Sequence, residues 1–253
     1  MAIAFRELQQ ASTTNGAVPS ITFTTLVSGD VVFLGTCSND SDAQLYTEDG
    51  NDNAATVIDN SSLIGDDDVY AMVSAFLFAG GSQVFRVATA GTSGFGLTLG
   101  GIAVSGLDVS NFAGFSYLGG SGANKAKVFG SSTNPDPPSV NMTAGNWSLV
   151  VAGSTNNDAA KTLPTGYTNE IDVAADAASA DASLGMGTKL ITATGAENPA
   201  AFGSWATGSW GAFTIELQEA PSGQPYIKRA GGVPWMAGGF RAPQGGRLWM
   251  PHR

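Results

Sequence analysis

Short runs in which apolar side chains recur at every second position constrain the fold of this chain more than any other feature. The clearest run is Trp210–Leu217, where Phe213, Ile215 and Leu217 fall on one side of an extended backbone and the residues between them fall on the other. A helix would need a period of 3.6, so a period of two indicates a β-strand with one face in a core. The residues Ile21–Thr25 show the same alternation with β-branched side chains.

Further candidate strands are apolar and end at turn-forming residues. One of them, Val69–Phe78, is compatible with a helix or a strand, and its β-branched and aromatic content and the Gly80-Gly81 that follows favour a strand. A short helix is an option only for Asp172–Leu184, which is rich in Ala and Asp. The other predicted strands are Val31–Cys37, Gln83–Thr89, Phe95–Val104, Phe112–Leu118, Trp147–Ala152, Thr168–Ala174 and Thr188–Ala193.

Many short strands separated by turns predict an all-β fold, an antiparallel β-sandwich or jelly roll. The chain contains 34 Gly, and charged residues make up only 13% of it, as suits tight turns between apolar strands. Composition divides the chain into an N-terminal arm (1–17), a sandwich domain (18–219) and an extended C-terminal arm (220–253). The C-terminal arm has no Asp or Glu but holds five of the eleven Lys and Arg, together with much Gly and Pro.

Net charge, cysteine content and hydrophobic runs restrict the classes of function that this chain can have. The formal net charge of −10 disfavours binding to nucleic acid, which requires clustered Lys and Arg. Cys37 is the single cysteine, so we expect a buried, inert thiol. The segment Met1–Glu7 lacks the apolar core of a signal peptide, and no apolar run approaches the roughly 20 residues of a membrane span. We therefore expect a soluble protein made in a cytoplasm, with no membrane partner.

The residues of common catalytic sites are scarce, and we predict no enzyme, no catalytic residue and no cofactor. The one histidine, His252, lies next to the C-terminus, where no rigid frame can hold it beside a nucleophile. Glu170 and Asp172 would share one face of a strand, as an acid pair of a glycosidase could, but a solvated strand face explains them more simply.

Two weaker binding hypotheses concern loops. The acidic stretch Asp40–Asp68 includes Asp49 and Asp52, whose oxygens are candidate calcium ligands, although their spacing is not that of an EF-hand. The alternative is an exposed, hydrated loop. Trp205, in a Gly- and Ser-containing loop, is the candidate for stacking on a sugar ring if its indole is exposed.

Segments spread along most of the chain resemble β-sandwich virion structural proteins of tailed bacteriophages, a loosely defined group of head and tail proteins. The resemblance lies in the opening Met-Ala-Ile-Ala-Phe-Arg, a Gly-Asp turn before a buried strand, a Trp-containing strand, an alternating closing strand and an Arg-Ala-Gly-Gly-Val tail. The segments are Met1–Arg6, Gly29–Val32, Val69–Phe78, Trp147–Val151, Trp210–Leu217 and Arg229–Met236.

The resemblance implies a virion structural protein that is assembled in the host cytoplasm. We expect a capsid decoration (cement) protein that stabilises the particle through its arms, as a homo-oligomer, with a trimer as the expected form, bound to the major capsid protein. The alternative is a tail or tail-fibre component whose sandwich binds a carbohydrate or a host receptor. Arg and aromatic residues are common at the centres of interfaces. The predicted partner-binding residues of the arm are Lys228, Arg229, Val233, Trp235, Met236, Phe240, Arg241, Arg247 and Trp249.

Overall fold

Antiparallel β-sheets make up the regular structure of the protein. The computed structural model describes residues 2–14, 17–39, 44–62, 69–90, 96–109, 125–155, 161–175 and 181–220, and all regular elements within them are strands. The predicted all-β sandwich is thus confirmed. Within the described residues there is no helix long and apolar enough to span a membrane.

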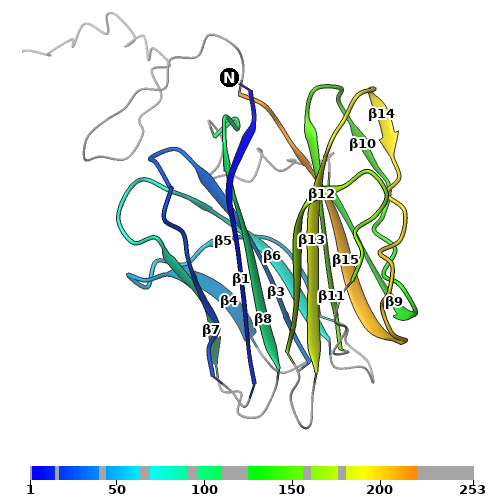
Figure 1. Ribbon diagram of the computed structural model, residues 1–253, viewed down its shortest axis with the longest axis horizontal. Helices are drawn as coiled ribbons and strands as arrows, with labels where there is room; N and C mark the ends of the chain where they lie inside the picture. The colour runs from blue at the N-terminus through cyan, green and yellow to red at the C-terminus, as the bar shows by residue number, and fades with distance from the viewer. Residues whose placement is uncertain are drawn as a thin grey trace, which may run out of the picture. The chain divides into compact units, whose positions relative to one another are not determined.

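Two five-stranded sheets form the sandwich (Figure 1). The first sheet has the order β1 (Ala4–Thr13), β8 (Leu97–Ser105), β3 (Val31–Ser38), β6 (Tyr70–Leu77) and β5 (Thr56–Ser62). The second sheet has the order β12 (Thr168–Ala175), β13 (Ala182–Leu190), β11 (Trp147–Ser154), β15 (Gly208–Leu217) and β9 (Lys125–Ser132). The strands β2 (Ser20–Thr22), β7 (Val84–Ala90) and β4 (Gln44–Asp49) form a third sheet, and β10 (Val140–Met142) pairs with β14 (Gly195–Glu197).

The central strands of the first sheet are buried on both of their faces. Val31, Phe33 and Cys37 of β3 face the second sheet and join the core between the two sheets. Val32 and Leu34 face the opposite way and pack in a second core with residues of β2 and β7. Two-sided burial explains why Val31–Cys37 is a continuous apolar run without alternation, because both faces of the strand lie away from water.

The second sheet is covered on its outer face by chain segments between strands. Phe213, Ile215 and Leu217 of β15 face the inner core, as the alternation predicts. On the other side, Val150 and Ala152 of β11 pack with a third cluster that includes Phe202 and Trp205.

Glycines let the two large sheets approach one another. A Cβ atom on Gly153 of β11 would lie 2.9 Å from the Ala71 side chain and 2.8 Å from the Cys37 sulfur. A Cβ atom on Gly35 of β3 would lie 2.7 Å from the sulfur of Met186. These positions therefore hold glycine because the facing sheet leaves no room for a side chain.

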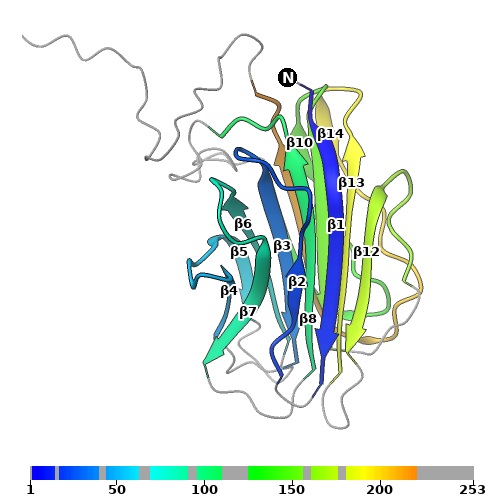
Figure 2. The same ribbon diagram turned by 60° about the vertical axis from the view of Figure 1, so that its left-hand side comes forward.

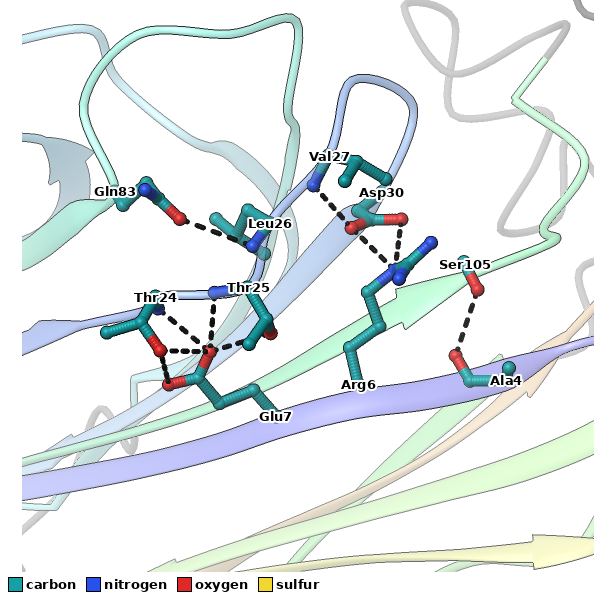
Figure 3. A network of polar contacts seen from close by, with 10 residues as sticks. All are labelled: Ala4, Arg6, Glu7, Thr24, Thr25, Leu26, Val27, Asp30, Gln83 and Ser105. Atoms are coloured by element: carbon teal, nitrogen blue, oxygen red, sulfur yellow. Dashed lines mark hydrogen bonds and ion pairs between the residues drawn. The ribbon is translucent and has the colours of Figure 1, made fainter.

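Acidic side chains fasten β1 to the segment that leads from β2 to β3 (Figure 3). The Glu7 carboxylate accepts hydrogen bonds from the backbone N–H groups of Thr24 and Thr25, at 2.8 and 3.0 Å. Asp30, which is almost fully buried, pairs with Arg6 at 2.8 Å and accepts a hydrogen bond from the Val27 N–H at 2.9 Å. The carboxylates thus satisfy backbone donors of a turn that no strand pairs.

Two expectations about the chain's organisation need correction. Residues 1–17 do not form an arm, because Ala4–Thr13 pairs along β8 as an edge strand of the first sheet. The acidic stretch Asp40–Asp68 is not one hydrated loop, since it contains β4 and β5, and Glu48 and Asp49 are buried. The option of a helix also fails at Ala182–Leu184, which begins β13.

Most predicted strands correspond to strands in the structure, whereas the predicted strand Phe112–Leu118 lies outside the described residues. Contacts divide the chain into the units Met1–Ser222 and Gly223–Arg253. The second unit also lies outside the described residues.

Substitution of Gly153 tests the close approach of the sheets. We expect Gly153→Ala to lower the free energy of unfolding by about 1–3 kcal/mol, because its methyl group has no space beside Ala71 and Cys37. The double variant Gly153→Ala/Ala71→Gly should recover part of that loss, since it removes one of the clashing groups. Urea denaturation measures both effects, and a single variant as stable as the parent would contradict the packing.

The lowered pKa of Glu7 predicts that the stability of the protein depends on pH. Burial raises the pKa of Glu7, but the hydrogen bonds from Thr24, Gln9 and Thr25 outweigh it and lower the pKa to about 2. Because the folded pKa lies below the unfolded value of 4.5, the stabilisation is complete above that pH and is lost as the pH falls towards 2. Glu7→Gln should therefore unfold at lower urea concentration than the parent at pH 7 but at a similar concentration at pH 2. Asp136→Asn, which removes an exposed charge elsewhere, is the control, and an unchanged gap across this range would refute the role of Glu7.

Candidate functional site

The free edges of the two large sheets meet at a seam between β1 and β12 (Figure 2). Among the described residues, β1 pairs with β8 on one side, β12 pairs with β13 on one side, and neither has a second strand partner. A shallow, open groove of about 260 Å³ follows this seam. Its lining residues are Leu8, Gln9, Gln10, Glu170 and Ile171, and we call it the seam groove.

At one position of the seam, a side-chain amide takes the place of a strand. The Gln10 carboxamide donates a hydrogen bond to the Asp172 carbonyl oxygen at 3.0 Å and accepts one from the Asp172 N–H at 2.9 Å. A residue on an adjacent antiparallel strand makes the same pair of bonds. Gln10 therefore satisfies the edge of β12 at Asp172.

The Asp172 side chain is fixed by a buried lysine. Lys161 Nζ lies 2.5 Å from the Asp172 carboxylate and donates to the Val173 carbonyl oxygen at 3.3 Å. Its ammonium group also lies 5.4 Å from the centre of the Trp205 ring, a cation–π distance. The Lys161 side chain is 2% exposed and that of Asp172 is 25% exposed, so the ion pair holds β12 against the segment that contains Trp205.

A bulge in β12 lies directly before this fixed position. The pairing with β13 shifts between Thr168 and Ile171. Asn169 has a φ of 57°, a left-handed conformation that costs free energy in a residue other than glycine, and its side-chain amide donates to the Thr188 hydroxyl at 2.7 Å. The bulge locally interrupts the ladder beside the groove.

Glu170 supplies the charge of the seam groove. Its side chain is exposed, and within the described part of the chain no hydrogen bond or ion pair holds its carboxylate. Asp172 shares the outward side of β12, as the sequence predicts, but Lys161 neutralises it. The Asp172 carboxylate is therefore held in an ion pair within the fold, whereas the Glu170 side chain lines the groove.

The other buried ionisable groups are bound within the fold. Burial raises the pKa of Tyr167, whose hydroxyl lies 2.8 Å from that of Ser148 and 3.3 Å from the Glu197 carboxylate. Burial likewise raises the pKa of the Cys37 thiol to about 12, so this cysteine stays protonated at neutral pH. The predicted burial of Cys37 is confirmed.

The structure does not support the two loop hypotheses. Trp205 is only 4% exposed and packs edge-to-face on Phe202, so the expectation of an exposed indole for sugar stacking is wrong. Asp49 accepts hydrogen bonds from the backbone N–H groups of Asn51 and Asn53, both at 2.9 Å, and Asp52 forms an ion pair with Arg86. Their oxygens are thus used within the turn, and the described residues hold no cluster of three metal-ligating side chains.

The predicted partner-binding residues of the C-terminal arm, from Lys228 to Trp249, all lie outside the described residues. Of the residues that build the seam, sequence reasoning identified Glu170 and Asp172 but missed Gln10, Lys161 and Asn169. Lys161 carried a usable signal, because it is one of only six Lys and Arg in residues 1–219. No family model, curated protein or solved structure matched this chain in the comparisons with known proteins.

Substitution of the two partners of the ion pair between Lys161 and Asp172 should lower the free energy of unfolding by unequal amounts. Asp172→Asn should destabilise the protein by about 3 kcal/mol, because it removes the carboxylate that lies 2.5 Å from the buried Lys161 ammonium group. Lys161→Met should cost less, since the Asp172 carboxylate that remains is partly exposed to water. Urea denaturation of the two variants and of the double variant measures the order, and the reverse order would contradict the assigned burial.

Proposed function

We propose that this protein is a non-enzymatic structural component of a tailed-bacteriophage particle, and specifically a capsid decoration protein. In this proposal the β-sandwich is the body, and the C-terminal segment of residues 220–253 binds neighbouring virion proteins, with the major capsid protein as the main partner. The proposal rests on the sequence resemblance and on how the chain distributes and uses its charges.

Opposite charges are separated along the chain. Residues 1–219 contain all 21 Asp and Glu but only six Lys and Arg, a formal charge of −15, whereas residues 220–253 carry +5. A basic segment with Trp, Met and Phe has the composition of an interface anchor. A segment too rich in Gly and Pro to form its own core can become ordered on a partner.

The observation that carries the proposal is that each of the six cationic side chains of the body has a partner within the described residues. Arg6, Arg86, Lys161 and Lys189 form ion pairs with carboxylates. Lys125 donates to a backbone carbonyl oxygen, and Lys127 lies over the ring of Phe129. The body therefore carries a large excess of acid with few exposed cations, of which Lys127 is one, whereas residues 220–253 carry five cations and no acid.

A structural role also agrees with the state of the buried ionisable groups. Asp30, Glu216 and Lys161 each bind backbone or side-chain partners that position strands and turns. Glu216, for example, accepts hydrogen bonds from the Thr143 N–H at 2.5 Å and from the Asn146 side chain at 2.8 Å. Such groups stabilise the sandwich, and this use supports a protein that acts through its surfaces.

The tail or tail-fibre role is the second candidate, and the polar seam groove is the feature that favours it. An open groove with a free carboxylate and amide groups is able to form hydrogen bonds with sugar hydroxyls. The two roles differ in stoichiometry, because a shell has hundreds of equivalent positions and a tail tip has a handful.

The copy number per particle tests the proposal. We expect hundreds of copies by quantitative mass spectrometry of purified particles, relative to the major capsid protein. Truncation after Ala220 should abolish incorporation, and Lys228→Glu/Arg229→Glu should weaken it in a salt-dependent way, because both remove cations from the binding segment. A handful of copies would instead favour the tail role, and full incorporation of the truncated protein would contradict the assigned role of the C-terminal segment.

A further inference from the structure

We propose that two copies of this chain associate by exchange of β1, so that β1 of each copy lies beside β8 of the other copy. The occupant of the position beside β8 is then a second copy of this chain. The inference concerns how copies of the chain bind one another, and it does not depend on whether the protein belongs to a phage particle.

The place of β1 in the chain allows the exchange. β1 precedes all other strands in the sequence, and residues 14–19 connect it to β2. Nine of its positions, from Ala4 to Thr13, pair with β8. β1 can therefore leave its place by rotation within one connection, while the other strands keep their order and their partners.

The side chains of β1 contribute little to the apolar cores. Each of them is exposed or half-buried, in strict alternation. Phe5 packs edge-to-face on Trp147, with 4.7 Å between the ring centres, and Ile3 and Ala11 pack at the margins of the cores. By contrast, all eight residues of β3 are buried. Because elements with few buried apolar contacts open at the lowest free energy, β1 should separate more readily than a central strand.

The strand β8 requires a partner at the edge that β1 occupies. Residues Leu97–Val104 of β8 are buried, and β3 pairs with the other edge of the strand. Departure of β1 would leave backbone groups of β8 unpaired next to an apolar core, which is unfavourable. A copy whose β1 has moved away is therefore an acceptor for a strand.

Polar contacts determine which strand fits this acceptor. They fix three successive features of β1: a cation, a carboxylate directly after it and an amide three residues later. The pairs are Arg6 with Asp30 at 2.8 Å, Glu7 with the N–H groups of Thr24 and Thr25 at 2.8 and 3.0 Å, and Gln10 with the backbone of Asp172 at 2.9 and 3.0 Å (Figure 3 shows the first two). The β1 strand of a second copy supplies the same groups in the same register.

The closed and exchanged forms differ mainly in the connection. In the closed form, in which β1 lies beside β8 of its own copy, the Thr13 hydroxyl donates a hydrogen bond to the Ala17 carbonyl oxygen. Pro19 favours an extended Val18, and the Pro19 carbonyl oxygen accepts a hydrogen bond from the Val87 N–H at 3.2 Å. The turn from β1 into β2 is thus confined to the residues between β1 and Val18.

The exchanged form removes the need for this turn. Residues 14–19 can extend over about 20 Å and carry β1 to a second copy. Because every contact of β1 with the body recurs between the copies, exchange sacrifices only the contacts within the connection and the independent motion of the two copies.

Disulfide trapping between two full-length variants tests the inference. Ala4 and Ser105 are partners in the ladder of β1 with β8, so Ala4→Cys of one copy reaches Ser105→Cys of another only if β1 has been exchanged. After joint incubation at high concentration and mild oxidation, we expect about ten-fold more disulfide-linked heterodimer than from a control pair. The control is Ala4→Cys with Ser131→Cys, an exposed position on β9. Peptide mass spectrometry identifies the bond, and Cys37 is buried.

The double variant Ala4→Cys/Ser105→Cys provides the reference for the geometry. In dilute solution its disulfide should close within one chain, because the closed form places both positions together. A disulfide that closes within the chain, with no more heterodimer from the mixed variants than from the control pair, would overturn the inference.

Deletion of Asn15 and Gly16 gives an independent measurement. The shorter connection hinders the turn from β1 into β2 but not the extended path to a second copy, so the fraction of dimer should rise. Size-exclusion chromatography with light scattering compares the deletion variant with the parent at equal concentrations. A deletion variant that stays monomeric at every concentration would also overturn the inference.

Discussion

Burial of both faces of the central strands of the first sheet is the constraint on which the rest of the structure depends. A strand such as β3 has neighbours on both sides and sheets or segments above and below it, so each of its eight residues is buried. Side chains must then interdigitate with two different layers, which explains why Gly35 and Gly153 lie where the facing sheet comes closest. The same burial requires each backbone group to find a partner inside the fold, and the antiparallel ladders of β3 with β6 and β8 meet that requirement.

Stacked sheets leave open edges, and this protein ties them together with long side chains. On one side Gln10 of β1 bonds to the backbone of β12. On the other side Lys125 of β9 donates to the carbonyl oxygen of Ile58, at 2.5 Å, where the pairing of β5 with β6 is interrupted by a bulge. Both ties therefore pair a side chain with an edge strand whose ladder is irregular. Bulges and polar or charged side chains at edge strands also oppose pairing between the sheets of different molecules. The features that close the sandwich therefore also oppose its aggregation through these edges.

Periodicity predicted the interior of the sandwich better than its edges. The alternation in Trp210–Leu217 identified β15 and its core face, because a strand next to a large apolar layer needs a regular pattern. The edge strand β1 was not predicted, because its partly exposed sequence has little apolar periodicity. The strand β4 was not predicted either, because its acidic residues suggested a loop, whereas Glu48 is paired with Arg86. The burial of Trp205 could not be predicted from local sequence, because Val150, Ala152 and Lys161 reach it only through tertiary packing. The sequence predicted only part of the seam groove. It identified Glu170 and Asp172 as a pair on one strand face, but it did not predict the ion pair of Asp172 with Lys161, which lies eleven residues earlier across a turn.

The way in which the chain uses its few cations connects stability with recognition. An acidic body repels itself, so each internal cation is most valuable where it neutralises a carboxylate that burial would otherwise destabilise, as Arg6 does for Asp30 and Lys161 for Asp172. Four of the six cations of residues 1–219 pair with carboxylates in this way, whereas within the described residues the Glu170 carboxylate has no such partner. The ion pairs therefore stabilise the fold, and the acidic residues that they do not neutralise leave residues 1–219 with a formal charge of −15.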